Sequence, residues 1–270
     1  MAPPWAASSA AGLVEALEAD TQRMARLSAM GPGELAALLG GDPLAAGPWI
    51  ETAARHGVVQ AQLVLAQMRL DGVGVAQDHA LALQWFRHAA RAGEPAAINM
   101  VGRCLENGWG EPQALAEAAR WYLAAAEAGD DWGAYNYANL LFDGRGLPQD
   151  QVQAIAWYQR AAAAGHGRAM NLLARCYEEG WGVARDLAQA GEWYERSAAT
   201  GYFRAQYNLA ALRAGRGQID AAFDLFEAAL RGATPGSLPE MALRLAAHPD
   251  ARLAALGRSF APAAEPGDPA

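Results

Sequence analysis

The sequence contains no lysine, so all 21 of its basic residues are arginine. Acidic residues number 29, and the formal net charge is −8. Broad binding to a phosphate backbone requires a concentrated basic face, which this charge balance argues against. A P-loop also requires a lysine, so we do not expect the glycine-rich turns described below to hold a nucleotide. Nucleic acid is therefore not an expected partner.

Cysteine is nearly absent, since only Cys104 and Cys176 occur. They lie 72 residues apart, and two cysteines do not make a disulfide framework in a chain of this length. Reduced thiols are typical of a cytoplasmic protein.

Long hydrophobic runs are also missing, because no stretch approaches the roughly 18 apolar residues of a membrane-spanning helix. The first 20 residues lack the basic flank and continuous apolar stretch of a secretory signal, and acidic residues begin at Glu15. We therefore expect no membrane insertion and a cytoplasmic location.

Catalytic and metal-binding motifs are not found. The five histidines are scattered, without the spacing that two metal ligands on one helix require, and G-x-S-x-G is absent. The sequence thus predicts a protein that is not an enzyme, with no catalytic residues, no metal and no cofactor. A hydrolase whose site is assembled from distant residues remains the alternative hypothesis.

What the sequence does contain is an internal repeat of 36 residues. It is marked by two columns of residues, Gly57, Gly93, Gly129, Gly165 and Gly201, and Trp49, Trp85, Trp121, Trp157 and Trp193. Each tryptophan opens a short stretch that ends in the glycine, as in "WYQRAAAAG" from residue 157. Such self-similarity is typical of repeat architectures.

Each repeat has the pattern of two helices joined by a short turn. Small and apolar residues recur at helical spacing in both halves, and a G-x-G sequence such as Gly108–Gly110 separates them. Glycine permits a positive φ, so it can end the first helix and reverse the chain. The pattern predicts antiparallel helix pairs in which small residues allow close packing and Trp and Tyr fill the wider gaps.

These residues resemble the Sel1-like repeat family, which is related to the tetratricopeptide repeats. The fourth repeat carries the pattern best, with Gly180, Gly182, Val183 and Asp186 in the turn and "WYERSAATG" from residue 193 in the second helix. The second repeat departs from it, having neither the valine nor the aspartate. The resemblance implies an all-α, right-handed α-solenoid of stacked antiparallel helix pairs. It also implies a bacterial scaffold for protein–protein interaction.

The repeat boundaries predict the organisation of the whole chain. We expect an N-terminal capping helix in residues 1–31, a degenerate repeat in 32–57, four full repeats in 58–201, a shortened fifth repeat in 202–232, C-terminal capping helices in 233–260 and a mobile tail in 261–270. The sequence "SLPE", Ser237 to Glu240, predicts a capping box at the start of the first C-terminal helix.

The candidate partner-binding residues come from the first helix of each repeat, which lines the concave wall in such a solenoid. Positions that differ between repeats, while the framework recurs, are the candidates. They are Asn99, Arg103, Trp132, Tyr135, Asn139, Arg168, Asn171, Arg175 and Tyr207. Amide, guanidinium and tyrosine side chains are suited to an extended peptide, so the expected partner is a protein or peptide. The other interpretation is that they are solvated, or paired within the array, as Arg103 with Glu106.

Two further tryptophans, Trp109 and Trp181, lie between the turn glycines of alternate repeats. One interpretation is that each ring folds over the end of an adjacent helix and tightens the stack. The other is an exposed aromatic rim that anchors a partner. A third role for the chain as a whole, self-association as a structural subunit, is also left open by the sequence.

Overall fold

A computed structural model describes residues 10–261 of the chain. Within these residues there are fifteen helices and no strand, which confirms the predicted all-α class. The predicted tail lies outside the described residues, apart from Ala261.

The chain divides into two compact units, residues up to Gly133 and residues from Ala134 onward. The helices of the first unit are α1 (Ala10–Ala29), α2 (Pro32–Gly40), α3 (Pro43–Arg55), α4 (Val59–Asp71), α5 (His79–Arg91), α6 (Pro95–Asn107) and α7 (Leu115–Glu127). α8 (Asp131–Asp143) contains the boundary. The second unit continues with α9 (Gln151–Ala163), α10 (Gly167–Glu179), α11 (Leu187–Ala199), α12 (Phe203–Gly215), α13 (Ile219–Gly232), α14 (Leu238–Ala246) and α15 (Ala251–Phe260).

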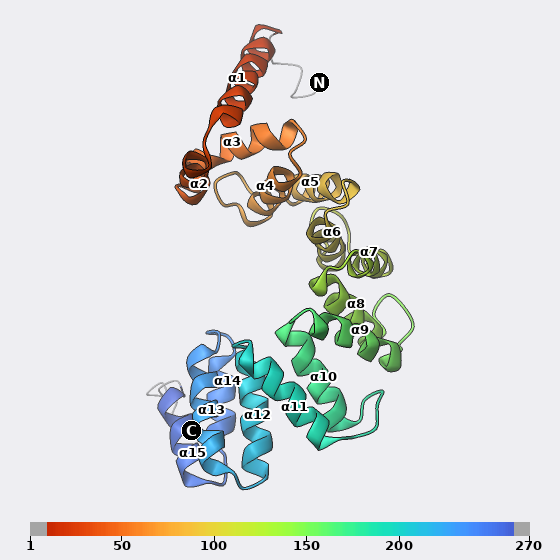
Figure 1. The fold of residues 1–270 in the computed structure, drawn as a ribbon, viewed down its shortest axis with the longest axis vertical. Coiled ribbons are helices and arrows are strands. Elements are labelled where there is room, and N and C mark those ends of the chain that lie inside the picture. Colours follow the sequence, from red (N-terminus) through yellow and green to blue (C-terminus); the bar gives the residue numbers. More distant parts are fainter. Residues whose placement is uncertain (1–9, 262–270) are drawn as a thin grey trace, which may run out of the picture. The chain divides into compact units, whose positions relative to one another are not determined.

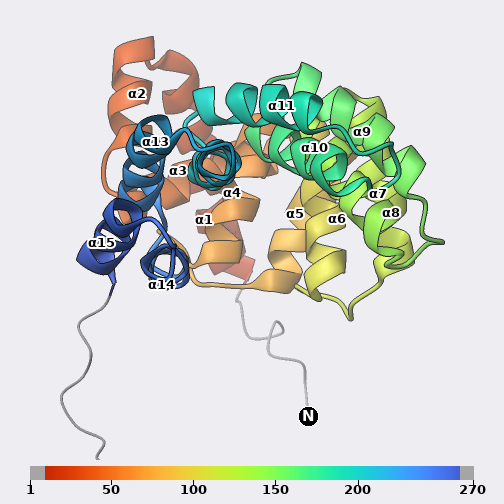
Figure 2. The ribbon, with the colours of Figure 1, turned by 90° about the horizontal axis from the view of Figure 1, so that it is seen from below.

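Consecutive helices pack as hairpins, which can be followed in Figures 1 and 2. α4 packs on α5 and α6 on α7 in the first unit, and α10 packs on α11 and α12 on α13 in the second. Neighbouring hairpins also touch, since α5 contacts α6 and α11 contacts α12. The predicted helix pairs and their stacking are therefore confirmed within each unit.

The turn inside each hairpin is built by its two glycines. Gly108 ends α6 in the left-handed conformation with φ +71°, and Gly110 follows with φ +87°. A backbone hydrogen bond from Ala114 N to Leu105 O, 2.9 Å long, then closes the loop. The same bond recurs 36 residues earlier and later, because the loop geometry is repeated with the sequence.

Aspartate at the end of this loop caps the second helix. The side chain of Asp78 accepts from Leu81 N, and that of Asp186 accepts from Ala188 N and Gln189 N. The second repeat has Ala114 at this place, and α7 has no side-chain cap. The departure from the family pattern thus removes a cap, which contributes about 1 kcal/mol in a typical helix.

The hairpin cores share one aromatic column. Its buried members are Phe86, Tyr122, Tyr158, Tyr194 and Phe226. Gly102 is needed beside Tyr122, since a Cβ atom there would lie 2.7 Å from the ring. Small residues and large rings therefore alternate between the two helices, as the sequence predicted.

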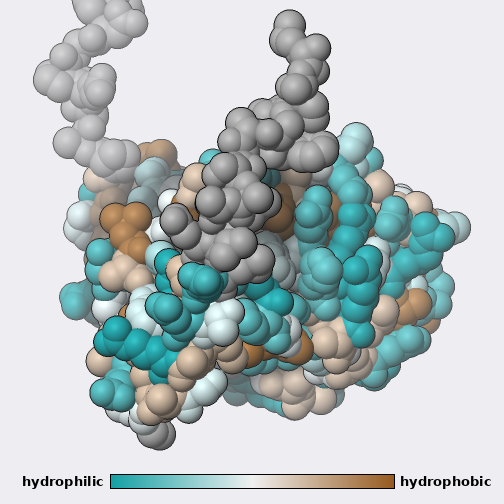
Figure 3. All heavy atoms as spheres, turned by 90° about the horizontal axis from the view of Figure 1, so that it is seen from above, coloured by the Kyte–Doolittle hydropathy of each residue, from teal (hydrophilic) through white to brown (hydrophobic). Residues whose placement is uncertain are grey.

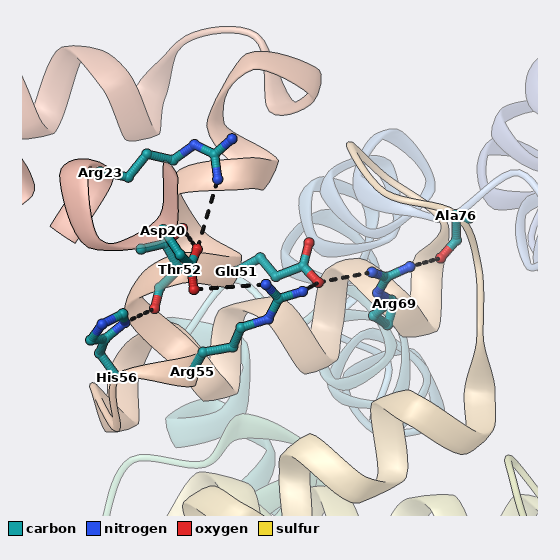
Figure 4. Close-up of polar contacts among 8 residues, drawn as sticks. All are labelled: Asp20, Arg23, Glu51, Thr52, Arg55, His56, Arg69 and Ala76. Carbon is teal, nitrogen blue, oxygen red and sulfur yellow. Dashed lines mark hydrogen bonds and ion pairs between the residues drawn. The ribbon is translucent and has the colours of Figure 1, made fainter. Parts of the chain in front are cut away.

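A polar network fastens α1 to the degenerate repeat (Figure 4). The Thr52 hydroxyl of α3 donates to Asp20 Oδ1 at 2.5 Å, and Asp20 is only 8% exposed. Arg23 and Arg55 lie 3.7 Å from the same carboxylate. A buried carboxylate is costly unless it is paired, so this network holds α1 in one register on α3.

Two short helices, α14 and α15, follow α13, and the expected capping box at Ser237 is wrong. Ser237 has no side-chain capping bond, and its φ and ψ of −99° and −27° are helical. An N-cap side chain needs extended backbone to reach the first turn. The Ser237 hydroxyl instead accepts from Arg204 at 3.2 Å, so it links α12 to the start of α14.

The two cysteines are free, as the sequence predicted, and both are buried. Burial raises the pKa of each thiol to about 11. We therefore expect no appreciable reaction of the native protein with a thiol-specific disulfide reagent at pH 8, and two equivalents of reaction in denaturant. Rapid labelling of the folded protein would contradict the buried positions.

Asp130 is a second group whose titration can be tested. Its carboxylate accepts from Gly133 N at 2.5 Å, directly before α8, and burial raises its pKa to about 6. Because this pKa lies above the unfolded value, the folded state loses stability as pH rises from about 4 to 6.

We therefore expect Asp130→Asn, which keeps the acceptor, to stabilise the protein at pH 7 by about 1 kcal/mol after allowance for solvent screening. Urea midpoints of both proteins at pH 4 and pH 7 measure this. A gain of equal size at both pH values would contradict the explanation.

Candidate functional site: the face of the first helices

The first helices have one constant face and one variable face. On the constant face, Ala66, Gly102, Ala138 and Ala174 all occupy the packed interior. One residue further on, Gln67, Arg103 and Arg175 are exposed and Asn139 is partly buried. The three exposed positions do not form the core, so packing does not constrain their chemistry.

Three of the candidate residues are not on the accessible face, which corrects the expectation. Asn99 and Asn171 are 6% and 5% exposed, and Tyr207 is 8% exposed. Asn171 accepts a hydrogen bond from Asn208 at 2.9 Å, so it joins α10 to α12. Tyr207 packs edge-on against Phe226 with ring centres 4.9 Å apart. Asn171 therefore lies where neighbouring hairpins meet and Tyr207 lies inside its own hairpin, and their sequence column did not reveal that both are buried.

The remaining candidates are accessible to different degrees. Arg103 and Trp132 are exposed in the first unit, and Arg168 and Arg175 are exposed in the second. Tyr135 is partly buried because its ring stacks on His166 at 4.7 Å. In the view of Figure 3, hydrophilic and hydrophobic residues are interspersed on the surface.

Glutamates next to these arginines have another partner. Tyr122 Oη donates to Glu106 at 2.6 Å, and Tyr194 Oη donates to Glu178 at 2.6 Å. Burial, and then these hydrogen bonds, raise the pKa of both tyrosines. Arg103 forms no ion pair with Glu106 within the described residues, and the two carboxylates join one helix of each hairpin to the other.

In the third repeat, the buried tyrosine has a different hydrogen-bond partner. It has Phe142 in place of the glutamate, and Tyr158 Oη there donates to Asn139 Oδ1 at 2.7 Å. The Asn139 side chain thus forms a hydrogen bond inside its hairpin. The sequence signal that could have revealed the glutamate bonds is the 16-residue spacing, which joins Glu106 to Tyr122 and Glu178 to Tyr194 but Leu70 to Phe86.

Trp109 and Trp181 are both partly buried. Trp109 lies beside His79, the first residue of α5, with ring centres 6.4 Å apart, and Trp181 lies edge-on to Phe142 at 5.5 Å. Each ring therefore contacts the preceding hairpin, a geometry in keeping with the first interpretation. Each also contacts an exposed arginine of its own hairpin, Arg103 at 5.7 Å and Arg175 at 5.1 Å from the ring centre.

An apolar cavity of about 330 Å³ lies between α1, α3 and α4. Its walls include Leu27, Trp49, Val58 and Val64. The one amide on its wall, Gln60, already donates to Glu94 at 3.0 Å. The cavity therefore offers apolar contact with few oriented polar groups, unlike a typical small-molecule site.

Residues 10–261 contain no cluster of three or more potential metal ligands among His, Cys, Asp and Glu. In the same part of the chain, every helix is too short or too polar to cross a bilayer.

Comparison with solved structures gives close matches to this fold. A protective antigen of uropathogenic Escherichia coli strains, described as having an SLR fold, is 27% identical with a TM-score of 0.70, over 89% of this chain. The match covers 55% of the antigen, so this chain spans about half its length. A Sel1 repeat protein from Oxalobacter formigenes is 28% identical with a TM-score of 0.66, over 75% of this chain and 86% of that one. No curated protein matches the sequence significantly.

The family comparison finds four consecutive repeats of one family in the chain. The model of the Sel1 repeat matches residues 59–94, 95–130, 133–166 and 167–202, which together make up more than half of the chain. These ranges coincide with the hairpins from α4 to α11. The chain therefore belongs to the Sel1 repeat family.

Proposed function

We propose that the protein is a non-enzymatic scaffold that binds a partner protein or peptide on the concave face formed by its first helices. Proteins of Sel1 repeats generally mediate protein–protein interaction. The observation that carries the proposal is the division of each first helix into a constant buried face and a variable accessible one. The buried face accounts for folding, whereas the accessible residues are available for recognition.

The residues proposed to contact the partner are the accessible candidates. They are Arg103, Trp132, Tyr135, Asn139, Arg168 and Arg175. Trp132 is 42% exposed, and large aromatic and arginine side chains contribute most to the binding energy of typical interfaces. Asn99, Asn171 and Tyr207 are proposed to support this face from the interior. The buried free thiols favour a reducing compartment, so we place the interaction in the cytoplasm.

The test is capture of a partner from native cell extract on the immobilised full chain, followed by measurement of Kd with the purified partner. We expect Arg103→Ala, Trp132→Ala and Arg168→Ala together to weaken binding by at least about 100-fold, since each such side chain typically contributes 1 kcal/mol or more. Matched changes on second helices, Arg160→Ala and Arg196→Ala, should leave Kd within about twofold. An unchanged Kd in the first variant would refute the proposed face.

A further inference from the structure

Two arginine–tryptophan pairs recur at the same place in alternate repeats. Arg103 lies over Trp109 in the first unit, and Arg175 lies over Trp181 in the second. In both, the arginine comes from the last two turns of a first helix and the tryptophan from the loop that follows. The positions are 72 residues apart in the sequence, so the two pairs are built by the same local geometry.

Neither guanidinium group has an ion-pair partner within residues 10–261. The nearby carboxylates of Glu106 and Glu178 are engaged by tyrosine hydroxyls, and Glu111 is bound by Arg87 at 2.7 Å. Arg103 has one further contact, a weak hydrogen bond of 3.4 Å to Met100 Sδ, and both arginines are exposed. Their remaining N–H donors therefore face solvent.

A guanidinium group held over an indole ring is suited to binding a carboxylate. The cation–π contact limits the conformations of the side chain, so less entropy is lost when its N–H groups form two parallel hydrogen bonds. Those bonds match the geometry of a carboxylate. The indole adds apolar surface for the methylene groups of an acidic side chain.

We propose that the Arg103–Trp109 and Arg175–Trp181 pairs are two equivalent carboxylate receptors, and that the partner presents an acidic segment whose glutamate or aspartate side chains occupy them. This rests on the proposed function and names the chemistry of the partner. The ligand is expected to be an anion because of charge complementarity. At both places the accessible charged group is an arginine that has no ion-pair partner within the described residues.

The chain carries its own control for this inference. Arg160 lies over Trp157 at 4.5 Å, and Arg196 lies over Trp193 at 4.1 Å. In these pairs the arginine follows the tryptophan by three residues within one second helix. They present the same cation–π contact and the same charge on the other helix of the hairpin.

The experiment uses the full chain labelled with 5-fluorotryptophan and observed by ¹⁹F NMR, with Trp109→Phe and Trp181→Phe to assign the two resonances. The probe is a capped hexaglutamate peptide, compared with capped hexaglutamine and with hexaglutamine that has a free C-terminal carboxylate. We expect saturable shifts of both resonances with hexaglutamate only. Arg103→Gln with Arg175→Gln should raise its Kd at least about tenfold, and Arg160→Gln with Arg196→Gln should change it less than about twofold.

Several outcomes would overturn the inference. They are equal shifts with capped hexaglutamine, an unchanged Kd in the Arg103/Arg175 variant, and an equal loss in the Arg160/Arg196 variant, which would indicate unspecific charge attraction. Shifts with the free C-terminal carboxylate alone would overturn the assignment to side chains. Thermal melting of each variant confirms that it is folded. The peptide titration does not require the cellular partner. A negative result in it can therefore be distinguished from a negative result in the partner-capture experiment.

Discussion

Replacement of Gly110 by alanine is expected to lower the free energy of unfolding by about 3 kcal/mol or more. Gly110 has a φ of +87°, and a Cβ atom there would collide with the carbonyl oxygen of His79 and lie 2.9 Å from Ala80 Cα. Both contacts are backbone atoms of α5, which belongs to the preceding hairpin. The loop would therefore have to move away from its neighbour, and packing between two repeats would be lost.

Gly129→Ala is the matched control for this prediction. Gly129 also has a positive φ, +93°, but a Cβ atom there would have no neighbour within 4 Å. Alanine at this position should lower the free energy of unfolding by about 1 kcal/mol, which is the energy needed to hold alanine in the left-handed conformation. Denaturant midpoints followed by circular dichroism compare the two variants. Equal costs would show that the close approach of the Gly110 loop to α5 does not contribute to stability.

Truncation of Tyr122 to alanine is expected to cost about 4 kcal/mol. Tyr122 is fully buried in its hairpin, and its ring lies against Gly102 of the other helix. Removing it leaves a cavity at the centre of the α6–α7 packing and also leaves Glu106 without its hydroxyl partner. Thermal and urea unfolding measure the loss.

Two substitutions separate the ring from the hydroxyl. Tyr122→Phe keeps the ring and removes the hydrogen bond to Glu106, so it should cost about 1–2 kcal/mol. Phe86→Tyr in a Gln67→Leu background adds a hydroxyl in the first repeat, where Leu70 stands in place of the glutamate and no amide remains 19 positions earlier. It should cost about 1–3 kcal/mol relative to Gln67→Leu alone, because the new donor is buried without an acceptor. Neutral results for both changes would contradict the hairpin bond described here.

Much of the fold could be predicted from the sequence because its determinants are local and repeated. The glycines at 36-residue spacing mark helix ends, since only glycine adopts the required positive φ without strain. The columns of tryptophan and alanine mark the packed faces, since a helix must bury its apolar side. The departure at Ala114 could also be seen, and its consequence, a missing cap, is equally local.

The candidate site could be predicted only in part, because its members are distinguished by contacts between helices. Asn99 and Arg103 lie one turn apart on α6, yet the structure buries the first and exposes the second. Glu106 has charge complementary to Arg103, but the hydroxyl of Tyr122, 16 residues later, takes its carboxylate. No spacing rule within one helix distinguishes these outcomes.

The sequence by itself determined the 36-residue period, the helix pairs and the glycine turns, because backbone conformation depends on residues a few positions apart. Only the tertiary structure decided which polar side chains remain available to a partner. That choice depends on which groups of the facing helix come within hydrogen-bonding distance. Tyr122 bonds to Glu106 in this way, whereas Arg103 has no ion-pair partner within the described residues.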